Sequence, residues 1–186
     1  MKKVFSVMVA LVLALSMNAA ERGKFIHVDC TTSKNLKPQL AFVQDRINGE
    51  DVTTLLVKTV NVNNYNEFTD ESRVLIRFAD DKAFRLNRVA GSVVEKKKHT
   101  EKRGTQTISF YDTFTSYDVD PEVIQKLEAG IAIIKVRIVF MANETKDYDI
   151  AEGYQEKMTS DLLKSYQEAA LNNKKANGDH GDDDFY

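Results

Sequence analysis

A basic run near the middle of the chain offers the first side chains that could do chemistry. It reads Glu95-Lys96-Lys97-Lys98-His99-Thr100-Glu101-Lys102-Arg103 and contains no apolar residue. Such a run is usually a solvated loop at the tip of a hairpin. Its cations are also suited to an anionic glycan or a phosphate-bearing partner. We therefore predict ligand-binding roles for Lys96, Lys97, Lys98, His99, Lys102 and Arg103.

A strand with hydroxyl groups along one face is predicted for residues 105–117. Apolar side chains at Ile108, Phe110 and Phe114 alternate with a set that carries hydroxyl groups. This second set is Thr107, Ser109, Tyr111, Thr113, Thr115 and Tyr117. The face can present rings and hydroxyls to a sugar, so Tyr111 and Tyr117 join the predicted binding residues. The alternative, which we prefer for the strand as a whole, is an ordinary solvent face, because threonine and tyrosine are good strand formers.

Nucleophilic chemistry has little support in the sequence. Cys30 is the single cysteine, and His27, three residues earlier, points to the opposite face of a strand. We expect this thiol to be buried in the core, with pairing between two chains as the alternative. There is no Gly-x-Ser-x-Gly motif, and the three histidines are too far apart in sequence for the usual zinc spacing.

Carboxylates are plentiful, but their spacing predicts no metal site. Asp118 with Asp120, Asp147 with Asp149, and the acidic cluster in residues 179–184 do not match an EF-hand loop. We interpret them as a helix cap, a turn and a solvated end. We predict no metal, no cofactor and no catalytic residue. Two carboxylates that meet only in the fold would make a small glycan-directed hydrolase, which stays the alternative.

The elements that position these residues are organised around residues 118–142. Asp120 is a good N-cap, Pro121 suits the first helical position, and Gly130 suits the end of a short helix. A long strand should follow, with Lys135 and Arg137 on one face. The other face is apolar and consists of Ala132, Ile134, Val136, Ile138, Phe140 and Ala142.

Other segments of the chain also alternate like strands. We predict strands at residues 24–30, 39–49 and 52–62, with an Asn48-Gly49 turn, and a hairpin at 72–89 that turns at 79–82. Later in the chain, Tyr154, Met158, Leu162, Tyr166 and Ala170 recur every four residues and predict an amphipathic helix that starts near residue 150 or 159. The expected fold is mainly β, an antiparallel β-sandwich or barrel-like sheet. It has a short helix before the last long strand and a C-terminal amphipathic helix, with an α+β fold as the alternative.

The first twenty residues have the composition of a secretory signal peptide. Lys2 and Lys3 precede an apolar stretch at residues 4–15, and small residues lead to Ala20. The apolar stretch is too short to span a bilayer, and no cysteine stands at the cleavage point. We expect an exported protein, periplasmic or extracellular, with no lipid anchor and no membrane span after cleavage. Residues 21–175 would form one β-rich domain, and residues 176–186 a disordered acidic tail.

Charge and a resemblance complete the functional prediction. The formal net charge of −2 indicates neither nucleic acid nor an anionic membrane as partner, so we expect a protein or a glycan of the cell envelope. The segments Leu127-Glu128-Ala129-Gly130-Ile131 and Ile134-Lys135-Val136-Arg137-Ile138 resemble a pattern in small uncharacterised exported proteins of Gram-negative gut bacteria, across residues 72–170. The resemblance implies a strand hairpin, a short helix and a strand with central basic residues, and it implies no activity. We predict a non-catalytic binding module, with the hydrolase and a structural or oligomeric envelope component as alternatives.

Overall fold

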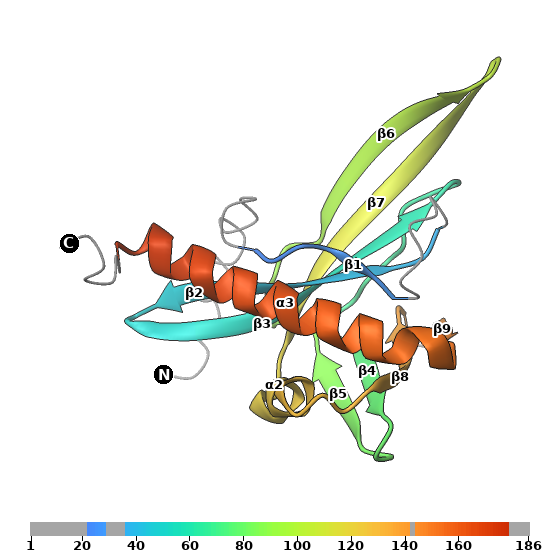
Figure 1. Ribbon diagram of the computed structural model, residues 1–186. Coiled ribbons are helices and arrows are strands. Elements are labelled where there is room, and N and C mark those ends of the chain that lie inside the picture. The colour runs from blue at the N-terminus through green and yellow to red at the C-terminus, as the bar shows by residue number, and fades with distance from the viewer. Residues whose placement is uncertain (1–21, 29–35, 142–143, 179–186) are drawn as a thin grey trace, which may run out of the picture.

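A computed structural model describes residues 22–28, 36–141 and 144–178 of the 186-residue chain. These residues form two antiparallel sheets and two helices (Figure 1). Sheet A has the strand order β1 (Ile26–His27), β2 (Gln39–Ile47), β3 (Glu50–Asn61), β7 (Gln106–Asp118) and β6 (Glu95–Arg103). Sheet B has the order β5 (Ala83–Asn87), β4 (Arg73–Phe78), β8 (Ile133–Val139) and β9 (Thr145–Asp149). The helices are α2 (Pro121–Glu128) and α3 (Glu152–Ala176).

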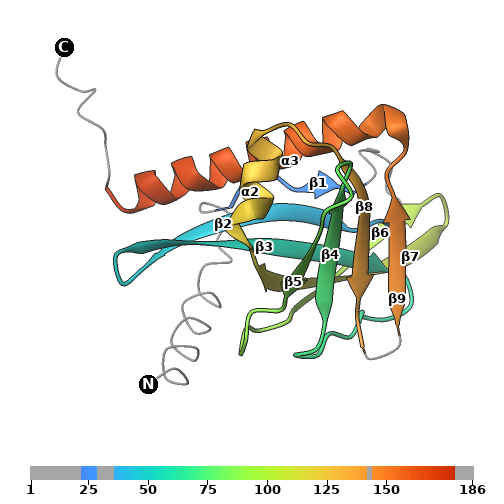
Figure 2. The ribbon, with the colours of Figure 1, turned by 90° about the horizontal axis from the view of Figure 1, so that it is seen from below.

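The strands of the two sheets run crosswise (Figure 2), and α3 packs against β2. One hydrophobic cluster joins the two sheets. Sheet A contributes Leu40, Phe42, Leu55, Val57 and Tyr117, and sheet B contributes Val74, Ile76, Phe78, Val136 and Ile138. The two sheets do not close into a barrel. The prediction of a mainly β, sandwich-like fold with a C-terminal helix is confirmed by the two antiparallel sheets and α3.

Two predicted turns have the backbone conformation that tight turns require. Asn48 and Gly49 both adopt positive φ, at 54° and 86°, as the tight turn between β2 and β3 demands. Asp81 has a φ of 63° in the turn between β4 and β5. Aspartate tolerates this region better than most residues do. Both hairpins are confirmed.

The predicted helix-to-strand unit forms, with one change in register. The Asp120 side chain accepts a hydrogen bond from the Glu122 amide at 2.9 Å and caps α2. In β8, a register shift places Ile133 opposite Phe78. Ile133 is therefore fully buried and Ile134 only half-buried, which breaks the predicted alternation. In addition, β8 is not the last strand, since β9 pairs with its free edge.

The buried face of α3 differs from the predicted stripe. The helix buries Met158, Thr159, Leu162, Ser165, Ala169 and Asn173. Tyr154 is instead 46% exposed, and Ala169 takes the place of Ala170. The reason is that an α-helix repeats every 3.6 residues, so a spacing of four drifts around the helix at each turn.

A seam of hydrogen bonds fixes α3 to the edge of sheet A. The Phe42 amide donates to Ser165 Oγ at 3.1 Å, and the Phe42 carbonyl accepts from the Gly23 amide at 2.9 Å. The Lys24 amide donates to Glu168 Oε2 at 2.8 Å. Residues 22–24 are therefore held between β2 and the helix.

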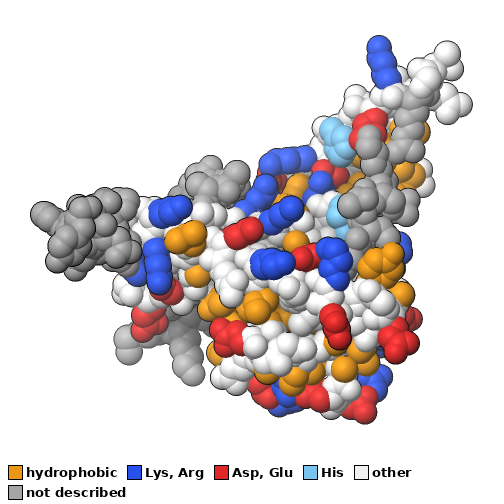
Figure 3. Space-filling view, in the orientation of Figure 1, with side chains coloured by type: hydrophobic (Ala, Val, Ile, Leu, Met, Phe, Trp, Pro, Cys, Tyr) orange, Lys and Arg blue, Asp and Glu red, His pale blue; other side chains and the backbone are white. Residues whose placement is uncertain are grey.

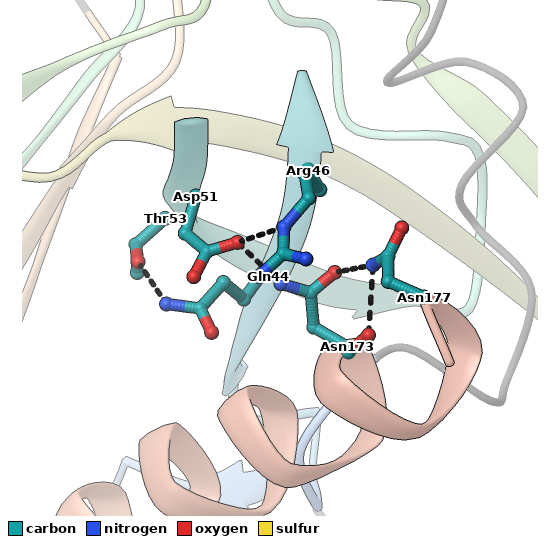
Figure 4. A network of polar contacts seen from close by, with 6 residues as sticks. All are labelled: Gln44, Arg46, Asp51, Thr53, Asn173 and Asn177. Atoms are coloured by element: carbon teal, nitrogen blue, oxygen red, sulfur yellow. Dashed lines mark hydrogen bonds and ion pairs between the residues drawn. The ribbon is translucent and has the colours of Figure 1, made fainter. Parts of the chain in front are cut away.

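A polar cluster anchors the C-terminal end of α3 to the β2–β3 hairpin (Figure 4). Asp51 Oδ1 accepts hydrogen bonds from Arg46 Nε at 3.1 Å and from Asn173 Nδ2 at 3.0 Å. Asn177 Nδ2 donates to the carbonyl and side-chain oxygens of Asn173, each at 2.8 Å. Asn173 is 1% exposed, so its buried amide is satisfied by partners on both elements.

Several predictions lie outside the described residues. They are the signal peptide at 1–20, the burial of Cys30 and residues 179–186 of the disordered tail predicted at 176–186. The first residue of that predicted tail, Ala176, instead ends α3. Neither of the two helices in the described part of the chain combines the length and the apolar character needed to cross a bilayer.

Candidate functional site

The candidate site lies on a two-stranded arm formed by β6 and β7. The whole of β6 pairs with the first nine residues of β7, from Glu95 opposite Phe114 to Arg103 opposite Gln106, and these paired segments form the arm. The pairing of β7 with β3 ends at Asn61, so the outer half of the arm has no third strand. The arm projects from the body in the ribbon and in the space-filling view (Figures 1 and 3). The prediction of a loop for the basic run is wrong, because the run forms an edge strand, where lysine is well tolerated.

One side of the arm carries only cations among its charged groups. Lys96, Lys98 and Lys102 lie opposite Thr113, Tyr111 and Thr107, and residues opposite each other share a face of the sheet. The three lysines are exposed, and no carboxylate of the described residues forms an ion pair with any of them. We call this surface the lysine face, defined as Lys96, Lys98 and Lys102 with Tyr65 and Tyr111.

Two tyrosines form the base of the lysine face. The rings of Tyr65 and Tyr111 meet edge to face with centroids 5.1 Å apart. Lys96 Nζ lies 5.5 Å from the Tyr65 centroid, and Lys98 Nζ lies 5.2 Å from the Tyr111 centroid. These cation–π contacts hold the ammonium groups near the rings without neutralising their charge.

The opposite side of the arm is balanced in charge. His99 stacks on Phe110 with centroids 5.2 Å apart, and its Nδ1 lies 3.6 Å from Asp112 Oδ2. Lys97 pairs with Glu95 at 2.6 Å. Strand alternation therefore places Lys97 and His99 on the face opposite Lys96 and Lys98, and the predicted site residues do not form one cluster.

Tyr117 does not join the arm. It is fully buried in the core cluster, and Thr113 and Thr115 of the same strand face are also fully buried. The preference for a solvent face is therefore wrong for this half of β7, since sheet B covers it. Only the outer half, from Thr107 to Tyr111, keeps the hydroxyl face accessible. The backbone of Arg103 pairs with Gln106 near the tip of the arm.

Replacing Tyr117 by phenylalanine is expected to raise the free energy of unfolding by about 1 kcal/mol. The Tyr117 hydroxyl has no hydrogen-bond partner among the described residues, and burial raises the pKa of the phenol above its ordinary value. Urea denaturation measures the change, and Tyr65→Phe at the partly exposed base of the arm serves as the control. A loss of stability in Tyr117→Phe would show that the hydroxyl is paired after all.

The acidic pair Asp147 and Asp149 lies on β9 and not in the predicted turn. Arg137 binds Asp147 through two hydrogen bonds of 2.5 and 2.7 Å, and Lys135 Nζ lies 3.0 Å from Asp147 and 3.2 Å from Asp149. The hydrogen bonds from Arg137 and then Lys135 hold the pKa of Asp147 well below its usual range. The pair therefore neutralises cations of β8.

Asp147→Asn is expected to cost about 1 kcal/mol of stability at pH 7, the upper end for an exposed ion pair. Because the folded-state pKa lies below the unfolded one, the ion pairs stabilise the protein above about pH 4. Their contribution is lost as the pH falls toward the folded-state pKa. Urea unfolding of both proteins at pH 7 and at pH 3 should show the difference shrinking. An equal difference at both pH values would contradict this origin.

Neither the described side chains nor the comparisons with known proteins assign a metal site or a family to this chain. Within residues 22–28, 36–141 and 144–178, no group of three or more His, Cys, Asp or Glu side chains is placed to hold a metal ion. The resemblance to small exported bacterial proteins stays a prediction. No protein-family model, curated protein or solved structure matches the chain.

Proposed function

We propose that the protein is an exported, non-catalytic binding module whose lysine face binds an anionic glycan of the cell envelope. The observation that supports this is the projecting arm, which presents three lysines and no acidic side chain on one face. The prediction of the basic run as a ligand site leads to the same surface, now reduced to Lys96, Lys98 and Lys102.

The spacing of the lysines suits a polymer better than a single small anion. Alternate residues of a strand are about 7 Å apart, so Lys96 and Lys102 are separated by about 20 Å along β6. A chain with a repeated negative charge can contact all three ammonium groups along this length. Tyr65 and Tyr111 add flat rings beside the first two lysines, which suit the apolar faces of sugar units.

The test compares two variants with the same loss of charge. Lys96→Gln, Lys98→Gln and Lys102→Gln are combined in the arm, and Lys164→Gln, Lys174→Gln and Lys175→Gln are combined on exposed positions of α3. Binding of residues 21–186 to a sulfated polysaccharide is measured by calorimetry at several salt concentrations, with neutral dextran as the uncharged probe.

We expect the arm variant to bind at least tenfold more weakly and to show a shallower salt dependence, because fewer ions are exchanged on binding. The α3 variant should bind like the original protein. Equal losses in both variants would mean that net charge alone governs binding.

The proposed export has its own test. Mass spectrometry of the protein recovered from expressing cells should show a polypeptide cleaved after residue 19 or 20, and an uncleaved N-terminus would contradict export through a signal peptide.

A further inference from the structure

The outer face of sheet B surrounds one leucine with arginines. Leu75 lies on β4 between Arg73 and Arg77, with Arg85 directly opposite on β5 and Arg137 directly opposite on β8. Like charges that share one face of a sheet repel each other, so this arrangement costs stability unless anions compensate it. The sequence separates β4 from β8 by more than fifty residues, and only the pairing of the strands brings these side chains together.

A shallow hollow of about 190 Å³ opens at this place. We call it the cationic hollow, and its lining is Leu75, Arg77, Ala83, Lys135 and Arg137. The side chains of Leu75 and Ala83 provide an apolar surface beside three cations. Pockets for drug-sized ligands measure about 300–1,000 Å³, so this hollow suits a single anionic group that carries a short apolar segment.

The protein's own carboxylates pair with the three cations that line the hollow, but not with Arg73 and Arg85 beside it. On the β9 side, Asp147 pairs with both Lys135 and Arg137, and Asp149 pairs with Lys135. Asp81 pairs with Arg77 at 2.6 Å. On the β5 side, Arg85 Nε donates to the neutral Asn87 side chain at 3.1 Å. Within the described part of the chain, neither Arg73 nor Arg85 has a carboxylate partner.

We propose that the cationic hollow binds an oxyanion with a short apolar tail, a carboxylate or a phosphate monoester. Guanidinium groups present paired donors that match either oxyanion, and the bidentate contact of Arg137 with Asp147 shows this geometry within the hollow. The ligand anion lies at the Leu75 end of the hollow, where it takes the donors of Arg73 and Arg85, which flank Leu75 without lining the hollow and have no carboxylate partner in the described part of the chain. Its apolar segment covers Leu75.

This arrangement makes Asp147 a competitor of the ligand. Its carboxylate occupies donors of Arg137 and Lys135 at the rim of the hollow. Removing that charge should strengthen anion binding, whereas removing arginines should weaken it. The two substitutions therefore have opposite expected effects, which a general loss of structure cannot imitate.

The experiment is a chemical-shift titration of residues 21–186 with hexyl phosphate, hexanoate, inorganic phosphate and hexanol. We expect hexyl phosphate or hexanoate to bind at least fivefold more tightly than both inorganic phosphate and hexanol. Arg73→Gln combined with Arg85→Gln should weaken that binding at least tenfold, and Asp147→Asn should tighten it at least threefold. Hexanol binding as tightly as the anions, or an unchanged affinity in the double arginine variant, would overturn the proposal.

The lysine-face variant is the matched control, because it removes cations from the other sheet. It should bind hexyl phosphate like the original protein, and the double arginine variant should bind the sulfated polysaccharide like the original protein. A loss of hexyl phosphate binding in the lysine-face variant would place the anion on the arm and overturn the assignment to sheet B. The outcomes for the two surfaces are thus independent of each other.

Discussion

Replacing Phe42 by alanine is expected to lower the free energy of unfolding by about 3–5 kcal/mol. Phe42 is 1% exposed, and its ring meets Tyr166 of α3 edge to face with centroids 5.6 Å apart. It also belongs to the core cluster that joins the two sheets. Truncation removes a large apolar side chain and leaves a cavity where β2, α3 and the core meet. This loss is a large part of the stability of a typical domain, about 5–15 kcal/mol.

Urea denaturation monitored by circular dichroism measures this effect. Leu171→Ala is the control, because this leucine lies on α3 but is 53% exposed, and its loss should change stability by less than about 0.5 kcal/mol. A cost below about 1 kcal/mol for Phe42→Ala would mean that α3 does not pack on β2 as described.

The second large effect is expected from Gly23→Ala. A Cβ atom at residue 23 would lie 1.8 Å from the backbone oxygen of Ser165 and 2.5 Å from its Oγ, so the backbone has to move. The movement separates residues 22–24 from α3 and weakens the hydrogen bonds of Phe42 with Gly23 and Ser165. Overpacking of this kind costs about 3 kcal/mol.

Gly153 provides the matched control for this substitution. It lies in the first turn of α3, and an added Cβ atom meets nothing within 4 Å. Gly153→Ala should therefore raise the unfolding free energy by about 0.5–1 kcal/mol, since alanine loses less backbone freedom on folding. Thermal denaturation of the two variants should shift in opposite directions. A neutral Gly23→Ala would show that residues 22–24 are not clamped beneath the helix.

The comparison between β6 and β7 shows where local patterns stop being informative. The sequence of β7 alternates between apolar and hydroxyl-bearing residues, and the alternation correctly separates the two faces of this strand. It does not say which face meets the core. The hydroxyl face of β7 is buried at Tyr117 and accessible at Tyr111, because sheet B covers only one half of the strand. For β6, the lack of apolar residues suggests a loop, yet pairing with β7 supplies the missing stabilisation.

Elements whose stabilising groups are close together along the chain could be predicted from the residues alone. The cap of Asp120 on α2 and the Asn48-Gly49 turn are of this kind, since each depends on a few neighbouring residues. Three features depend on pairing between distant segments and could be known only from the fold: the projection of the arm, the burial of Tyr117 and the group of arginines around Leu75. The physical reason is that strand pairing and burial are set by contacts between segments far apart in sequence, and a local pattern contains no information about its distant partner.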